Sequence, residues 1–156
     1  MKELLEYRVK LVERLGEATI EFCAACTGYN DPFAITVGDW TVHQIAAHTR
    51  DVEKSVYGAR VRRVLEQENP EFASFDADAW MAKHYRKDEP LTQILDELSA
   101  SVNGLCEMLK DVPREAWSRV SRHETMGGEL TMQLWVERSL AHIEEHLTEL
   151  KKAGNP

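Results

Sequence analysis

The hydrophobic positions of the chain recur every three or four residues in four long stretches. This spacing puts apolar side chains on one face of an α-helix, as in amphipathic helices that share a core. The stretches cover about residues 3–27, 41–65, 90–110 and 130–152. The clearest stripe lies in the third and consists of Leu91, Ile94, Leu98, Val102, Leu105 and Leu109. The pattern therefore predicts four long helices.

Turn-forming residues separate these stretches. Gly28 follows the first, Pro70 follows the second, and Gly127-Gly128 precedes the fourth. Asp39 or Thr41 is placed to cap the second helix, because both side chains can accept a hydrogen bond from the backbone of the first turn. The boundaries of the four helices are therefore marked in the sequence.

The connections hold shorter elements. We expect a short helix within residues 76–86 and a turn or short helix from 113 to 117, whereas the alternation typical of strands is almost absent. These features predict an all-α four-helix bundle, and the connections of a dozen or more residues allow crossovers as well as hairpins. With 156 residues, 43% of them hydrophobic, the chain is expected to form one domain over residues 1–156.

Net charge and hydropathy limit the classes of binding partner that the protein is expected to have. The formal net charge is -8, so we expect no nucleic-acid partner, because counterion release requires clustered Lys and Arg. No apolar run approaches the roughly 20 residues of a membrane span, and the first residues lack a signal-peptide core. We expect a cytoplasmic protein without a membrane partner. Apolar residues between Phe72 and Trp80 would cover either the bundle or a second copy, which leaves a homodimer open.

The three cysteines, Cys23, Cys26 and Cys106, form an odd set without the spacing of a disulfide framework. Cys23 and Cys26 match C-x-x-C, but they close a predicted helix. Redox motifs instead open a helix after a strand, where the thiol pKa is lowered. We therefore expect buried structural cysteines, with redox or metal chemistry as the alternative.

The chemistry suggested by the sequence lies in its histidines. His142 and His146 in H-I-E-E-H project from one helix face, because four residues turn about 400° and rise about 6 Å. His48 borders the apolar face of the second helix, whereas His43 is predicted to point away from it. Antiparallel packing of the second and fourth helices would bring His48 level with the pair, and parallel packing would separate them by roughly 12 Å. The alternative is three ordinary polar residues beside a core.

Two motifs carry a family resemblance. The run Trp40-Thr41-Val42-His43-Gln44-Ile45-Ala46-Ala47-His48, followed by Asp51 and Glu53, resembles the helix-two motif of the DinB/YfiT-like metalloenzyme superfamily. The C-terminal H-x-x-x-H resembles the helix-four motif. The resemblance implies a four-helix bundle with a crossover between helices two and three. It also implies a divalent metal ion held by His48, His142 and His146, which are the residues that the helical geometry selects.

A site of three histidines leaves a coordination position open, which favours catalysis over a structural role. Relatives in the superfamily include bacillithiol- and mycothiol-dependent transferases and isomerases. We expect a metal-dependent enzyme with Zn or Ni, acting on a small-molecule substrate, with a low-molecular-weight thiol as a candidate partner and S-transfer as a candidate reaction. Metal-dependent hydrolysis, a non-catalytic metal- or ligand-binding bundle and a metal-free interaction domain are the alternatives.

Acidic residues near the histidines bear on the expected chemistry. The zincin motif H-E-x-x-H has its glutamate directly after the first histidine, where this chain has Ile143, so zincin proteolysis is not expected. Glu144 and Glu145 are expected on the solvated face. Glu149 and Asp51 are placed to accept hydrogen bonds from His146 and His48, although a surface role is favoured for both.

Overall fold

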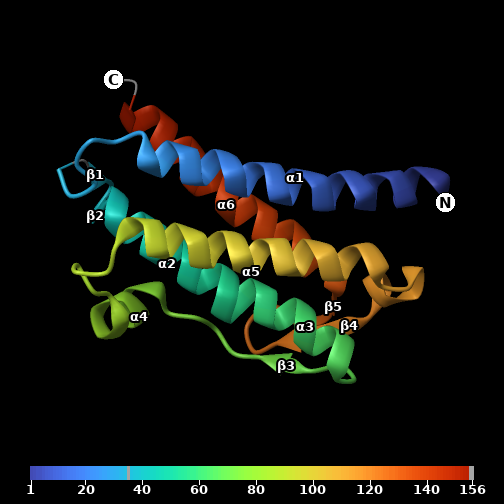
Figure 1. Ribbon diagram of the computed structural model, residues 1–156. Helices are drawn as coiled ribbons and strands as arrows, with labels where there is room; N and C mark the ends of the chain where they lie inside the picture. Colours follow the sequence, from blue (N-terminus) through green and yellow to red (C-terminus); the bar gives the residue numbers. More distant parts are fainter. Residues whose placement is uncertain (35, 155–156) are drawn as a thin grey trace.

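The computed structural model describes residues 1–34 and 36–154. Its long helices are α1 (Lys2–Thr27), α2 (Val42–Val52) with its continuation α3 (Gly58–Glu66), α5 (Leu91–Asp111) and α6 (Met132–Gly154). In Figure 1, α2, α3 and α5 run from left to right, and α1 and α6 run back. The predicted four-helix bundle is confirmed, and its second and fourth helices are antiparallel.

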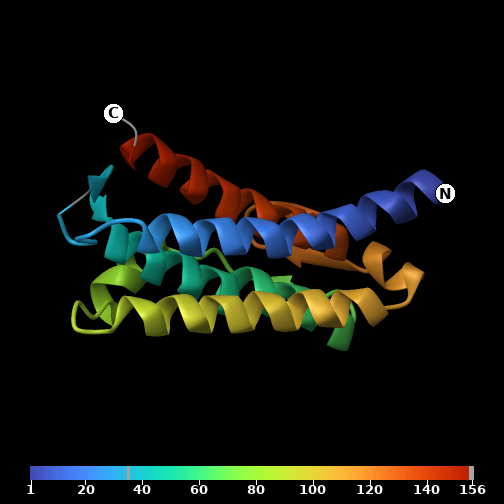
Figure 2. The ribbon, with the colours of Figure 1, turned by 45° about the horizontal axis from the view of Figure 1, so that its top comes forward.

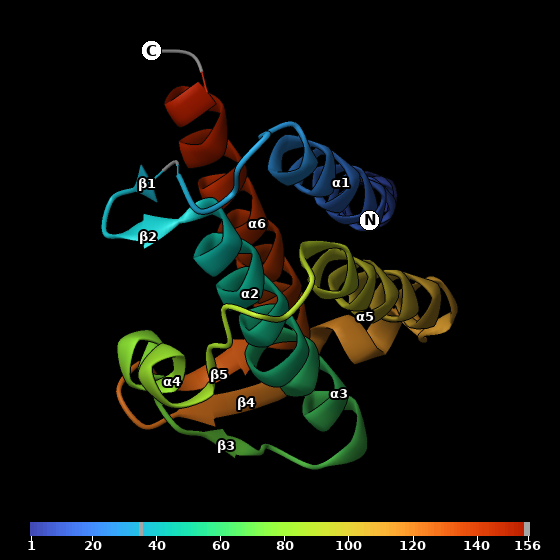
Figure 3. The same cartoon turned by 60° about the vertical axis from the view of Figure 1, so that its left-hand side comes forward.

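The order of the helices around the core differs from that of simple successive hairpins. α1 packs against both α5 and α6, while α2 and α3 lie on α5 and α6 from the other side. Viewed from the end in Figure 3, α2 and α3 lie between α5 and α6. Figure 2 shows α1 and α5 side by side along most of their length. Because α5 runs parallel to α2, the chain must cross back along the bundle between them.

The second helix begins where the sequence marks it. Thr41 Oγ1 accepts a hydrogen bond from the Gln44 backbone N–H (3.2 Å), and Gln44 Oε1 accepts one from the Thr41 N–H (2.8 Å). This reciprocal capping box satisfies two backbone donors that the helix itself leaves without partners. Of the two predicted caps, Thr41 is therefore the one used, and it fixes where His48 lies along the bundle.

The crossover contains β3 (Glu71–Phe72) and the expected short helix, α4 (Ala77–His84), and polar contacts tie it to α2. Arg50 is buried and pairs with Glu89 (2.6 Å) on the crossover and with Glu97 (3.1 Å) on α5. His43 lies 2.7 Å from Tyr85 Oη through Nδ1 and 2.7 Å from the Glu89 carbonyl through Nε2. His43 was predicted to point away from the apolar face of the helix, and it is nevertheless 1% exposed, because the crossover covers it.

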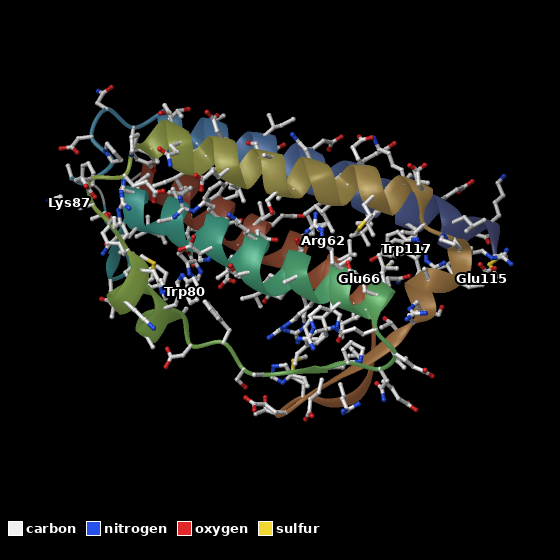
Figure 4. All side chains as sticks on the ribbon, turned by 60° about the horizontal axis from the view of Figure 1, so that its bottom comes forward. Arg62, Glu66, Trp80, Lys87, Glu115 and Trp117 are labelled. Carbon is white, nitrogen blue, oxygen red and sulfur yellow. The ribbon has the colours of Figure 1, made fainter. Side chains whose placement is uncertain are left out.

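Trp80 is a further contact between the crossover and α2. Figure 4 shows it on α4, at the end of the bundle opposite Trp117. Its indole N–H donates to Asp51 Oδ2 over 3.0 Å. Asp51 also accepts from Arg50 Nε at 2.9 Å. Asp51 has neither the surface role that was favoured nor the alternative of accepting from His48, because one oxygen bonds Trp80 of the crossover and the other bonds Arg50.

Two small sheets were not predicted. A hairpin of β1 (Thr36–Val37) and β2 (Trp40–Thr41) precedes α2. A second sheet joins β3 in parallel to β4 (Val120–His123), and β4 antiparallel to β5 (Gly127–Thr131). The turn or short helix expected before β4 is the 3₁₀ segment η2 (Arg114–Ser118). In Figure 3 the larger sheet lies below α2 and α6, between α4 and α3.

The core takes its side chains from every long helix. Among the least exposed are Leu15, Phe22, Ile45, Val61, Leu98, Leu105, Trp135 and Ile143. Phe72 of β3 packs edge-on against Trp135 of α6, with ring centroids 5.6 Å apart, so this apolar part of the crossover covers the bundle. In the described residues, no helix is long and apolar enough to cross a bilayer.

The cysteines belong to this packing. Cys26 is fully buried and Cys106 nearly so, while Cys23 is half-buried with Sγ 3.5 Å from Ser99 Oγ. All three are free thiols, and burial raises the pKa of each. Because a reactive cysteine has a lowered pKa, these surroundings suit the structural reading of the C-x-x-C pair.

A π-helical turn interrupts the second helix, which the sequence predicted as continuous. This turn, η1 (Glu53–Tyr57), ends where the Gly58 N–H donates to the Glu53 carbonyl, five residues back. A Cβ at position 58 would lie 2.7 Å from that carbonyl oxygen, closer than real Cβ contacts allow. Glycine therefore permits the turn. Short π-helical turns occur frequently at functional sites.

Candidate metal centre

Three imidazoles converge between α2 and α6. His142 Nε2 lies 3.1 Å from Nε2 of His48 and 3.1 Å from Nε2 of His146. The three rings stand nearly perpendicular to one another, with interplanar angles of 73°, 89° and 88°. Each histidine offers a ligand atom within 4.8 Å of the others, so the trio could hold a metal ion. The sequence prediction that antiparallel helices bring these residues together is thus met in the structure.

Carboxylates behind two of the rings orient them. The His146 Nδ1–H donates to Glu149 Oε2 (2.9 Å), and the His142 Nδ1–H donates to Glu53 Oε1 (3.1 Å). An ionised carboxylate only accepts hydrogen bonds, so opposite Glu149, and opposite Glu53 when a nearby cation favours its carboxylate, each Nδ1 keeps its proton and each Nε2 presents a lone pair. Glu149 therefore has the role that the sequence allowed it, in place of the surface role that was favoured.

The arrangement fits a divalent cation. Two lone pairs that face one point repel each other, and a cation between them removes that repulsion. Two tetrahedral bonds of about 2.1 Å place their nitrogen atoms roughly 3.4 Å apart, close to the observed 3.1 Å. Three histidine nitrogens, two of them on rings fixed from behind, match the ligand set of catalytic zinc sites.

Burial keeps two of the candidate ligands neutral. It is the main cause that lowers the pKa of His48 to about 3 and the pKa of His142 to about 3. Like-charge repulsion from neighbouring imidazoles lowers both further. The neutral imidazole is the form that binds metals, so both rings are ready to coordinate at neutral pH.

Glu53 is the functional candidate that sequence reasoning did not assign. It is 2% exposed, and its second oxygen accepts from Ser139 Oγ over 2.5 Å. Burial raises the pKa of Glu53 to about 8, although the Ser139 hydrogen bond opposes this. A dication on the far side of His142 would favour the carboxylate. The sequence did hold one signal, because Glu53 follows Thr49 of the apolar stripe by one helical turn, and a carboxylate on a core face needs partners.

The three histidines line a cavity of about 530 Å³. The Trp40 ring lies 4.7 Å from the His48 ring, and the Tyr57 ring lies 5.6 Å from the His142 ring, measured between centroids. Residues from the larger sheet and the crossover complete the walls. A larger cavity of about 710 Å³ between α1 and α5 contains no histidine, so the smaller one is the candidate site.

The other histidines and the side chains next to the trio divide between core, surface and pocket. Trp135 is fully buried, as core packing required, and Ser139 contacts Glu53. His84 is exposed and stacks on Trp80. His123 is 8% exposed and lines the cavity. The larger sheet, which sequence reasoning missed, places it there.

Comparisons with known proteins identify a family and a similar fold. The model of the DinB superfamily matches residues 9–150. Among solved structures, the fold is similar to YfiT from Bacillus subtilis, a probable metal-dependent hydrolase with an unusual four-helix bundle topology. That match has a TM-score of 0.76 and 24% sequence identity, and it covers 94% of this chain and 87% of the other. A search of the curated proteins finds no match.

Proposed function

The chain belongs to the DinB superfamily, and we propose that it is a metal-dependent enzyme whose divalent ion is held by His48, His142 and His146. The observation that carries the proposal is the convergence of three Nε2 atoms on a cavity, with His142 Nε2 3.1 Å from each of the other two. Zn²⁺ and Ni²⁺ are the ions proposed first, because imidazole suits both.

The protein's own residues would prepare the site. Glu53 and Glu149 hold the rings of His142 and His146, and Ser139 holds Glu53 in turn. When bound, a divalent ion with an open position supplies Lewis acidity and acidifies a small ligand such as water or a thiol. Trp40 and Tyr57 flank the histidines and limit the access of solvent to them.

Two reaction classes suit such a centre. Transfer to a low-molecular-weight thiol is the first, because acidification of the thiol needs no carboxylate base in the cavity. Glu53 faces away behind His142, and Glu145 at the rim is exposed. Hydrolysis is the second, because the YfiT structure is described as a probable metal-dependent hydrolase. In either case the cavity of about 530 Å³ favours a small-molecule substrate.

Metal analysis tests the site. Protein purified without a histidine tag and supplied with Zn²⁺ or Ni²⁺ should hold about one ion per chain. His48→Ala should lose it, because two histidines alone bind weakly. His84→Ala is the matched control, since His84 is exposed on α4 and should change nothing. No bound ion under any divalent supplement, or a metal content unchanged by His48→Ala, would refute the proposed centre.

Turnover assays separate catalysis from binding alone. The loaded protein is incubated with a generic electrophile and each of several cellular thiols, and in parallel with ester and amide substrates. Thiol conjugation that disappears in His142→Ala supports the transferase, and metal-dependent cleavage supports the hydrolase. A protein that holds its ion but turns over neither class would be a metal-binding bundle without catalysis.

A further inference from the structure

The wall of the cavity nearest the larger sheet carries a cation with unused donors. Arg60 of α3 is half-buried, and its guanidinium lies 4.7 Å over the Trp135 ring and 5.5 Å over the Phe72 ring. One N–H donates to the Ala73 carbonyl over 2.9 Å. Among the described residues, no carboxylate lies within ion-pair distance of Arg60. Most of its five N–H groups therefore remain free for a ligand.

A second donor on this wall is fixed by its hydrogen bonds. His123 Nδ1 accepts from the backbone N–H groups of Thr125 (3.1 Å) and Met126 (3.3 Å). Nδ1 therefore carries no proton, and the ring is in the tautomer with hydrogen on Nε2. Nε2 has no partner in the described part of the chain, yet no buried side-chain polar atom there is left unsatisfied. The Nε2–H is thus accessible, and His123 lines the cavity.

Trp135 lies beside both donors. It is fully buried, and its indole N–H donates to Ser121 Oγ over 2.8 Å, which fixes the ring. The His123 ring centroid lies 6.4 Å from the ring that Arg60 covers. Tyr57 connects this wall to the histidines, because it lies one helical turn before Arg60 and 5.6 Å from the His142 ring. The cavity therefore has a hydrogen-bonding wall beside the candidate metal centre.

We propose that Arg60 and His123 bind the carboxylate of an organic acid, which is the substrate class of the enzyme proposed above; this inference rests on that proposed function. One guanidinium and one neutral N–H suit a single negative charge, and the planar fork of arginine matches a carboxylate. Glu145 at the rim disfavours a dianion, and Val52, Val56 and Phe75 give the cavity apolar surface for a carbon skeleton.

Benzoate, an aromatic monocarboxylate, tests the subsite by titration calorimetry with both metal-free and metal-loaded protein. Arg60→Gln should weaken benzoate binding about tenfold or more, because hydrogen bonds to charged groups are among the strongest. His123→Asn should weaken it about threefold to tenfold. Its side-chain oxygen can still accept from the Thr125 turn, while nothing reaches the position of Nε2. Arg86→Gln, on the exposed side of the crossover, is the charge-matched control and should change nothing.

A conservative variant and a second anion provide two further tests of the subsite. Arg60→Lys retains the charge and the stem over Trp135, so partial recovery of binding is expected even if Arg60→Gln is poorly folded by thermal unfolding. Inorganic phosphate should bind at least about tenfold more weakly than benzoate, since it offers nothing to the apolar wall.

The failure of this inference differs from the failure of the metal centre. Wild-type affinity for benzoate in a folded Arg60→Gln or Arg60→Lys variant would overturn the inference, as would benzoate binding that vanishes without metal. Tighter binding of phosphate would overturn the assignment to an organic acid. If the protein holds no ion but metal-free protein binds benzoate through Arg60, the subsite stands and the proposed centre fails. Normal metal content in the Arg60 and His123 variants is expected throughout.

Discussion

Replacing Gly58 with alanine should loosen the π turn and, through Glu53, the candidate metal centre. The added Cβ would lie 2.7 Å from the Glu53 carbonyl oxygen, whereas ordinary contacts begin at 3.4 Å. The turn must therefore open by about 0.7 Å at this point. The obstacle is backbone, so no side-chain rotation can relieve it. The displaced carbonyl belongs to the residue whose side chain orients His142.

The expected loss in stability follows from three terms. Overpacking in a well-packed region costs about 1–3 kcal/mol, and weakening the Gly58 N–H to Glu53 hydrogen bond costs about 1 kcal/mol. Alanine recovers up to about 1 kcal/mol through its higher helix propensity. The net expectation is a free energy of unfolding lower by about 1–3 kcal/mol, measured by urea unfolding of metal-free protein.

Gly104 supplies the matched control. It lies within α5, is exposed, and a Cβ there meets nothing closer than the Arg62 guanidinium at 3.8 Å. Gly104→Ala should therefore raise the free energy of unfolding by about 0.5–1 kcal/mol. In competition with a chelator, Gly58→Ala should lose about tenfold in Zn²⁺ affinity while Gly104→Ala keeps it. Stabilisation of both variants with unchanged Zn²⁺ affinity would show that neither fold nor site needs the π turn.

Three further changes probe other contacts. Glu53→Gln should weaken Zn²⁺ binding about 10- to 100-fold in the same competition assay. Lys54→Gln, on the exposed side of the turn, should leave Zn²⁺ affinity unchanged. Equal Zn²⁺ affinities of the two variants would show that Glu53 does not orient His142. Arg50→Met should lower the free energy of unfolding by about 1–3 kcal/mol. This loss is smaller than for a fully buried ion pair, because the partners of Arg50 are 15–39% exposed. The control Arg86→Met should stay within about 0.5 kcal/mol of wild type. Cys26 in the native protein should react with a disulfide reagent at least about a thousandfold more slowly than in denaturant. The reason is that Cys26 is fully buried and that burial raises its pKa. Rapid labelling of Cys26 in the native protein, located by mass spectrometry, would contradict this.

The helices and the histidine trio were readable from the sequence because both depend on helical periodicity. The apolar stripes of α1, α5 and α6 are long, so their boundaries came out within a few residues. His48, His142 and His146 lie beside those stripes, and antiparallel packing then sets their depth along the bundle. Local spacing and one packing rule were sufficient for these features.

The other features depend on contacts between distant segments. The strands of the larger sheet have two to five residues, too few for alternation to stand out, and β3 pairs with a strand some 50 positions later. His123 and His43 are buried by the sheet and the crossover, whose positions helical periodicity does not define. The π turn could not be recognised from the hydrophobic pattern, because one widened turn changes the spacing of the apolar residues little. Its sign in the sequence is Gly58.

The larger sheet places residues that line the pocket on a different part of the protein from the candidate metal ligands. The candidate metal ligands lie on helices that also form the core, so changes near them affect folding as well as chemistry. His123 lies instead at the end of a short strand with exposed neighbours, in a segment that adds little to the bundle's core. Substitutions in this segment can alter which molecules the pocket accepts at small cost in stability. Such a division would let selection diversify substrate preference while the metal-binding scaffold remains intact.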